Sequence, residues 1–98
     1  MKAPEFEWDS AKSQTNVRKH GVSFEEAQTV FSDERGLLMH DPDHSNDEDR
    51  FVLLGLSSSS RALVVCHCSR REGDVIRIIS ARKADRREQQ TYRQRWTS

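Results

Sequence analysis

Two arginines interrupt an apolar run near the end of the chain, and they are the first candidates for chemistry. The run covers residues 75–82 and reads Val-Ile-Arg-Ile-Ile-Ser-Ala-Arg. Its composition predicts a strand buried on both faces, and strict alternation puts Arg77 and Arg82 on opposite faces. A guanidinium stays charged and grips a phosphate with two parallel hydrogen bonds, so Arg77 predicts an anion-binding site. The alternative is an ion pair between Arg77 and one of the chain's many carboxylates.

A histidine lies in the preceding apolar run, residues 62–68, which predicts the other strand of a central hairpin. An imidazole exchanges a proton near neutral pH, so His67 is a candidate for acid–base chemistry. The alternative is a core histidine bonded to the backbone. Its neighbours Cys66 and Cys68 share one face of the predicted strand, where they are poorly placed for a disulfide. A single C-x-C pair also lacks the four ligands of a structural zinc site, so we expect free thiols in a reducing cytoplasm.

Other cations lie where predicted elements begin or end. Lys19 and His20 close a predicted helix that also holds Lys12. A helix C-terminus recruits cations through its dipole without any catalysis, which is the alternative interpretation of Lys19 and His20. Arg50 begins a predicted strand and Arg82 ends one, and from both positions a side chain reaches a phosphate at a sheet rim. These residues are candidates for contacts with a polyanion.

Single aromatic residues are candidates for stacking on nucleic-acid bases: Trp8, Tyr92 and Trp96. At strand and helix spacings such residues more often belong to the core, and Tyr92 is the strongest stacking candidate of the three. Residues 40–49 hold two histidines and five carboxylates. This segment lacks the glycine of a calcium loop and the H-E-x-x-H pattern of a zinc helix, so we expect a solvated acidic loop and no metal ion or other cofactor.

Length and composition indicate one small domain. The chain has 98 residues, of which 33% are charged, and its mean hydropathy is −0.88. Apolar residues are concentrated in 51–56, 62–68 and 75–81, which is enough to predict a core. Residues 1–50 hold six Lys and Arg against twelve Asp and Glu, whereas residues 51–98 hold ten against four. The basic half predicts either a solvated surface or a face for a polyanion such as RNA. Neither a signal peptide nor an apolar run long enough to span a membrane is evident.

Periodicity and capping signals predict an α+β fold, with helices on a mainly antiparallel sheet of four to five strands. A short edge strand is expected at 5–8, followed by a helix that starts at Asp9 or Ser10 and ends at His20. Ser23 and Glu26 have the spacing of a capping box, which predicts a second helix. Further strands are expected at 37–40 and 50–56, before the central hairpin and a last helix that starts near Asp85 and Glu88.

With these elements in place, the sequence resembles the BrnT toxins of bacterial type II toxin–antitoxin systems. The matching residues are spread over nearly the whole chain: Phe6-Glu7-Trp8-Asp9, Lys12, Asn16, Lys19-His20-Gly21-Val22, Phe24-Glu25-Glu26-Ala27, Val30-Phe31 and Arg77-Ile78-Ile79-Ser80-Ala81-Arg82. The resemblance implies a RelE-like ribonuclease fold, RNA as the substrate, and a BrnA-type antitoxin that carries a DNA-binding domain. DNA would then be contacted only through the antitoxin. Lys83 stands where we expect an arginine. Lysine keeps the positive charge but lacks the planar guanidinium group that forms two parallel hydrogen bonds.

A metal-free ribonuclease needs a base for the 2′-hydroxyl, donors for the phosphorane oxygens and an acid for the departing 5′-oxygen. The candidate catalytic residues are Arg77, His67, His20, Lys19 and Arg82, and the candidate substrate-binding residues are Arg50, Lys12, Tyr92 and Trp8. The resulting hypothesis is a cytoplasmic endoribonuclease that inhibits translation. The alternative is a non-catalytic interaction or corepressor module that acts with a DNA-binding antitoxin.

Overall fold

The computed structural model describes residues 3–41 and 50–97, with side chains as far as Arg95. Most of the expected acidic loop and the side chain of Trp96 therefore lie outside the described residues. The elements in chain order are β1 (Glu5–Glu7), α1 (Ser10–His20), α2 (Phe24–Thr29), the 3₁₀ turn η1 (Val30–Ser32), β2 (Leu37–His40), β3 (Arg50–Leu56), β4 (Ala62–Arg70), the 3₁₀ turn η3 (Arg71–Gly73), β5 (Val75–Lys83) and α3 (Arg86–Thr97).

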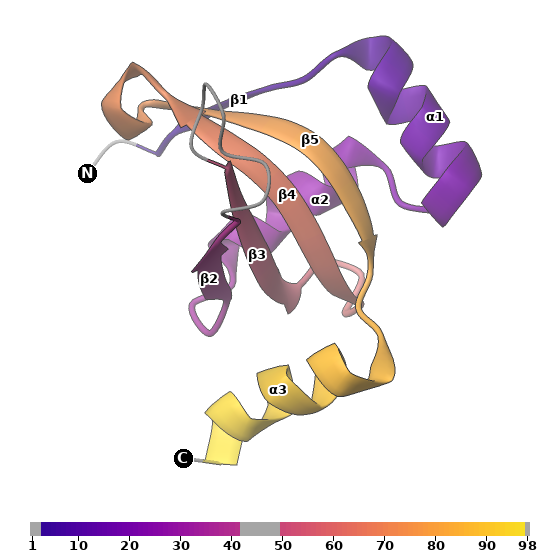
Figure 1. Cartoon of the computed structure of the whole chain (residues 1–98), viewed down its shortest axis with the longest axis vertical. Coiled ribbons are helices and arrows are strands. Elements are labelled where there is room, and N and C mark those ends of the chain that lie inside the picture. The colour runs from indigo at the N-terminus through magenta and orange to yellow at the C-terminus, as the bar shows by residue number, and fades with distance from the viewer. Residues whose placement is uncertain (1–2, 42–49, 98) are drawn as a thin grey trace.

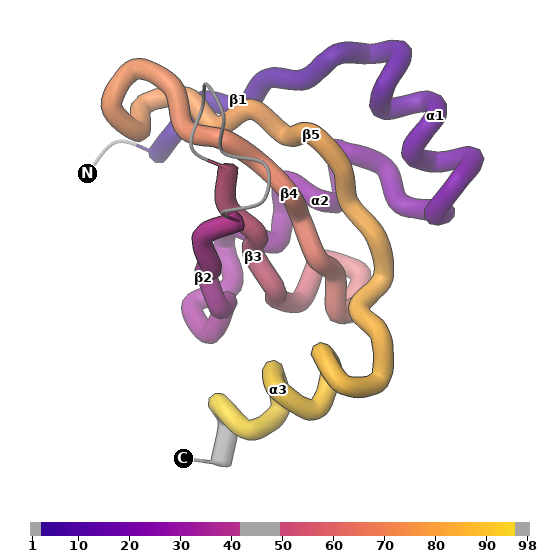
Figure 2. Tube along the Cα trace, viewed as in Figure 1, coloured from indigo at the N-terminus to yellow at the C-terminus, as the bar shows by residue number. Residues whose placement is uncertain are grey.

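The strands form one mixed sheet in the order β1-β5-β4-β3-β2. Strands β2, β3, β4 and β5 pair antiparallel with their neighbours, and only the short β1 runs parallel to its neighbour β5. Figure 2 shows the strands side by side, from β2 and β3 at one edge to the long β4–β5 hairpin. The predicted α+β class with a mainly antiparallel sheet is confirmed, and the fifth strand is the N-terminal segment at the edge.

Local capping residues set both ends of α1. The Asp9 carboxylate accepts hydrogen bonds from the backbone N–H groups of Ala11 (2.8 Å) and Lys12 (3.1 Å), which have no partner inside the helix. Gly21 ends the helix in the left-handed conformation, with φ of 69°, which glycine adopts without strain. The predicted helix from Asp9 or Ser10 to His20 is confirmed.

The second helix begins as expected, but its capping box is only half formed. Ser23 Oγ accepts a hydrogen bond from the N–H of Glu26 at 3.0 Å. The Glu26 carboxylate turns to the β3–β4 turn instead, where it accepts from Nε of Arg61 at 2.9 Å and from the Ser57 hydroxyl at 2.6 Å. The hydrogen bonds from Arg61 lower the pKa of Glu26. Glu26 therefore connects α2 to the turn between β3 and β4.

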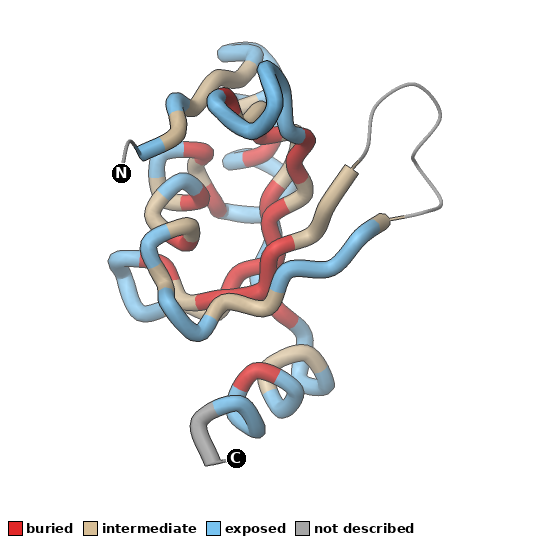
Figure 3. Tube along the Cα trace, turned by 90° about the vertical axis from the view of Figure 1, so that its left-hand side faces the viewer, coloured by how far each residue is buried: buried red, intermediate tan, exposed pale blue. Residues whose placement is uncertain are grey.

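Helices cover the two faces of the sheet unequally (Figure 1). On one face α2 packs Phe24, Ala27 and other apolar side chains against strands β3, β4 and β5. On the other face α3 covers only one end, where Tyr92 packs on Leu54 and Val64. Figure 3 shows the buried segments concentrated in the central strands and α2, whereas α3 is mostly exposed. None of the described helices is long and apolar enough to cross a membrane.

A β-bulge in the middle of β5 changes which side chains share a face. Cys66 of β4 pairs with Ser80, and the next residue, His67, pairs with Ile78, so Ile79 is an extra residue. Beyond the bulge the alternation of β5 is reversed, because an inserted residue shifts the period of two by one. The prediction that strict alternation separates Arg77 from Arg82 is therefore wrong, and the two lie on the same face.

Candidate active site

Arginines from three strands share the face of the sheet that α3 covers only in part. Arg50 pairs with Cys68, Cys68 pairs with Arg77, and Arg77 pairs with Glu7 of β1. Paired residues point to the same side of a sheet, so these four form one row across it. The same rule adds Ser80 and Arg82, which pair with Cys66 and Val64, and Arg70 follows two residues after Cys68. We call this surface the arginine face: Arg50, Arg70, Arg77, Arg82, Glu7, Cys66, Cys68 and Ser80.

Arg77 is both paired and accessible. Its Nη1 donates to Oε2 of Glu7 at 2.9 Å, and the same oxygen lies 3.6 Å from Nη1 of Arg70. The Arg77 side chain is 31% exposed and that of Glu7 is 39% exposed. The expected alternative, an ion pair with a carboxylate, is therefore present, but it lies at the surface. One carboxylate faces two guanidinium groups here, so these three side chains keep a net positive charge.

Arg82 is held by the start of α3. Its Nη1 and Nη2 donate to the two oxygens of Glu88, both at 2.8 Å. Glu88 and Asp85 cap the helix reciprocally, because the backbone N–H of each residue donates to the side chain of the other, at 2.8 and 2.9 Å. The hydrogen bonds from Arg82 lower the pKa of Glu88. The helix start thus fixes the direction of the Arg82 guanidinium at the rim of the arginine face.

A cavity of about 360 Å³ between α1 and β5 brings the N-terminal cations to the edge of this face. Its lining includes Lys12, Lys19 and His20 from the helix and Ile79 and Ser80 from the strand. Lys12 and Lys19 are seven residues apart, which places them on one side of a helix. Ser80 belongs to both surfaces, because it also pairs with Cys66 across β4 and β5 on the arginine face.

Asn16 fixes α1 against β5 at the point where β1 has ended. Its Nδ2 donates to the carbonyl groups of Val22 and Ala81, both at 2.8 Å, and its Oδ1 accepts from the N–H of Ala81 at 3.2 Å. The side chain is buried, as expected for a polar group that replaces a strand partner. We did not single out Asn16 for this role from sequence; an asparagine on a helix with few apolar residues was the available signal.

His67 does not join the arginine face. It neighbours Cys68 along β4 and therefore points to the other side, where its ring lies edge-on to Phe31 at 4.8 Å and stacks with Phe51 at 6.0 Å. It is 4% exposed, and its Nδ1 lies 3.1 Å from the carbonyl oxygen of Val65. Burial lowers the pKa of His67 and favours the neutral ring. This placement corresponds to the alternative of a core histidine bonded to the backbone.

The two aromatic candidates for stacking are also engaged inside the protein. Trp8 packs edge-on against Phe24, with ring centroids 6.1 Å apart. Tyr92 is 4% exposed, and its hydroxyl donates to Oδ2 of Asp33 at 2.6 Å. Asp33 Oδ2 also accepts from the N–H of Leu56 at 2.8 Å. Tyr92 therefore fastens α3 to the sheet, whereas Trp8 is half-buried.

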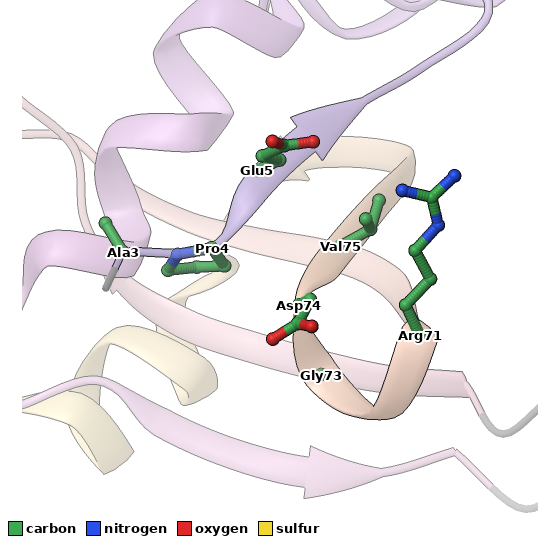
Figure 4. Close-up of a pocket in the computed structure, with 7 residues that line it drawn as sticks. All are labelled: Ala3, Pro4, Glu5, Arg71, Gly73, Asp74 and Val75. Carbon is green, nitrogen blue, oxygen red and sulfur yellow. The ribbon is translucent and has the colours of Figure 1, made fainter. Parts of the chain in front are cut away.

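A second cavity, of about 200 Å³, lies at the opposite end of β5 beside the β4–β5 turn. It is lined by Ala3, Pro4, Glu5, Arg71, Gly73, Asp74 and Val75 (Figure 4). Arg71 is its single cation, so it lacks the concentration of positive charge found at the α1 cavity. In the part of the chain that the structure describes, no group of three or more His, Cys, Asp or Glu could hold a metal ion.

Comparison with known proteins gives a match to a family model and a match to a solved structure. A family model described as "Ribonuclease toxin, BrnT, of type II toxin-antitoxin system" matches residues 8–88. The crystal structure of the ribonuclease toxin BrnT from Brucella abortus is similar to this fold, with a TM-score of 0.62 and 22% sequence identity over 86% of this chain and 100% of that one. No curated protein matches the sequence. At this identity the structural likeness supports the fold alone, and the expected RelE-like relationship stays a prediction.

Proposed function

Because the chain belongs to the BrnT family of ribonuclease toxins of type II toxin–antitoxin systems, we propose that it cleaves RNA at the arginine face and so inhibits translation. The main support is the strand register, which collects Arg50, Arg77 and Arg82 on one face. The α1 cavity adds Lys12, Lys19 and His20 at its edge. Cations held by a sheet and a capped helix suit a single-stranded polyanion, whose phosphates they bind without base pairing.

The proposed reaction is attack of the RNA 2′-hydroxyl on the adjacent phosphate. Arg77 donates hydrogen bonds to the phosphorane oxygens, where negative charge accumulates in the transition state. Lys19 and Arg82 add positive charge on either side, while Arg50 and Lys12 bind neighbouring phosphates. His20 is the histidine that borders the face, and it supplies the proton for the departing 5′-oxygen. Because His67, Tyr92 and Trp8 are packed elsewhere, we leave them out of this site.

Metal independence is part of the same proposal, because the guanidinium and ammonium groups supply the charge neutralisation that a bound cation would otherwise provide. RNA cleavage is expected to continue at the same rate in the presence of EDTA. Loss of cleavage in EDTA that Mg²⁺ restores would contradict this part.

A type II toxin has a protein antitoxin, and we assign that role to a BrnA-like protein with a DNA-binding domain. The toxin would then reach DNA only through this partner, and both would act in the cytoplasm. The resemblance of the sequence to BrnT toxins supports this assignment. Co-expression is expected to remove the toxicity of the chain, and a stable complex is expected on size-exclusion chromatography.

Expression of the chain alone in a bacterial host tests the function. We expect growth arrest and fragmentation of total RNA, both relieved by Arg77→Ala. Arg18→Ala removes an equal charge from the exposed side of α1 and should stay toxic. Soluble protein that causes no arrest would contradict the enzyme and favour the non-catalytic corepressor. Arrest by Arg77→Ala at the wild-type level would remove Arg77 from the site.

A further inference from the structure

A single carboxylate stands within the row of arginines, and its position has a chemical use. Glu7 lies on the three-residue strand β1, in register with Arg77 of β5. We propose that Glu7 is the general base that takes the proton of the RNA 2′-hydroxyl. This inference rests on the proposed RNA cleavage, and it adds the group that the cationic residues cannot supply.

The contacts of Glu7 leave part of its carboxylate available. The hydrogen bond that it accepts from Arg77 (2.9 Å) and its ion pair with Arg70 (3.6 Å) both use Oε2. Among the described residues, no hydrogen bond reaches Oε1. With 39% of the side chain exposed, Oε1 can meet a ligand that is bound to Arg77. A phosphate held by Arg77 would bring its own ribose next to this oxygen, within the reach that general-base catalysis requires.

The other carboxylates near the arginine face are either bonded by neighbouring groups or do not adjoin Arg77. Both oxygens of Glu88 accept bonds from Arg82, and one also accepts from the N–H of Asp85. Asp9 caps α1 through its side chain. Glu5 pairs with Val75, one row away from Arg77. Glu7 is therefore the carboxylate among these that both adjoins the phosphate-binding arginine and keeps an oxygen without a bond.

Base and acid would then stand on either side of the scissile phosphate. Glu7 adjoins Arg77, whereas His20 lines the cavity beside Ser80, three residues further along β5. Three residues of an extended strand span about 10 Å. A phosphate between these points meets the carboxylate on the side of the 2′-oxygen and the imidazole on the side of the 5′-oxygen.

The step balances as a transesterification. The 2′-hydroxyl proton moves to the Glu7 carboxylate as the bond from O2′ to phosphorus forms. The bond from phosphorus to O5′ then breaks, and O5′ takes a proton from the His20 imidazolium. The products are a 2′,3′-cyclic phosphate and a 5′-hydroxyl end, with no oxidant or further reactant. A later exchange with water returns one proton from Glu7 and one proton to His20.

The test is Glu7→Gln, since the amide oxygen can still accept the bond from Arg77 but cannot act as this base. We expect the cleavage rate of an RNA substrate to fall about 100-fold or more. Binding of a 2′-O-methyl RNA of the same sequence should stay unchanged or tighten, because a negative charge is lost. Glu5→Gln, on the same face of the same strand, should cleave at the wild-type rate.

Each contrary result has its own meaning. A Glu7→Gln protein that cleaves at the wild-type rate overturns the assignment. A protein that loses cleavage and 2′-O-methyl RNA binding together also overturns it, since Glu7 would then only position Arg77. If the wild-type protein cleaves no RNA, free or on ribosomes, the proposed function itself fails and the role of Glu7 fails with it.

Discussion

The Asn16 side chain is hydrogen-bonded to both backbone polar groups of Ala81, with Nδ2 2.8 Å from the carbonyl oxygen and Oδ1 3.2 Å from the nitrogen. A helix side chain thereby takes the place of a strand at the edge of β5. The contact also sets the position of α1, and hence of Lys12, Lys19 and His20, relative to the arginine face.

Asn16→Ala should lower the free energy of unfolding by about 3 kcal/mol, because it leaves buried backbone groups of Val22 and Ala81 without a partner. Urea denaturation followed by circular dichroism measures this change. Gln14→Ala on the exposed side of α1 should stay within about 0.5 kcal/mol of wild type. A loss of the same small size for Asn16→Ala would show that the Ala81 contact adds little to stability.

Tyr92→Phe should lower the free energy of unfolding by about 2 kcal/mol, since the hydroxyl bonds to the ionised carboxylate of Asp33. Binding of 2′-O-methyl RNA should be unchanged, because the Tyr92 ring is buried between α3 and the sheet. Thr91→Ala, an exposed change on the same helix, is the control for helix stability. Reduced RNA binding with unchanged stability would restore Tyr92 as a stacking residue.

His67 should make the stability of the fold decrease as the pH falls below about 6.5, the usual pKa of a histidine. Because burial lowers its pKa in the folded protein, the unfolded chain binds the proton first as the pH falls below about 6.5. Stability contributed by the neutral ring is thus complete above that pH and is lost on acidification. Urea denaturation at pH 7.5 and 5.5 should show a smaller loss for His67→Phe than for wild type.

The same His67→Phe protein separates the core role from a catalytic one. It should cleave RNA at the wild-type rate at pH 7.5, where the folded protein is stable. Loss of cleavage in a folded His67→Phe protein would return this histidine to the catalytic set.

RNA binding should weaken with salt according to the number of phosphate contacts. Arg50→Ala and Arg77→Ala should each reduce the slope of log affinity against log salt concentration by about 0.7, the value for one contact with a single strand. Fluorescence anisotropy with a labelled 2′-O-methyl RNA measures the slope. Arg18→Ala should leave it unchanged, and an equal reduction in this control would indicate binding through overall charge.

Features that depend on neighbouring residues could be predicted from the sequence. The Asp9 cap, Gly21 in its left-handed conformation and the reciprocal cap of Asp85 and Glu88 are each set within a few residues of chain. The order of strands and helices followed from the same local signals, because each hydrophobic run is bounded by a turn or a cap.

Features that depend on pairing between distant residues could not be predicted from the sequence. Alternation within β5 alone gives no sign that Ile79 is an extra residue, because a bulge exists only relative to the partner strand. In the same way, the pattern around His67 fits either face until Phe31 and Phe51 are seen to enclose the ring. The hydroxyl of Tyr92 finds Asp33 across 59 positions of sequence, which no local signal predicts.

The bulge at Ile79 makes the chemistry of this surface a matter of strand pairing as well as residue identity. In a regular β5 of the same length, Ser80 and Arg82 would turn toward α2 while every polar group of the protein remained in the sequence. Loss of Ile79 together with its bulge would instead leave Ser80 opposite Cys66 and Arg82 opposite Val64, and so keep both on the arginine face. Relatives that keep this spacing of arginines but pair the two strands without an extra residue would carry Arg77 and Arg82 on opposite sides of the sheet.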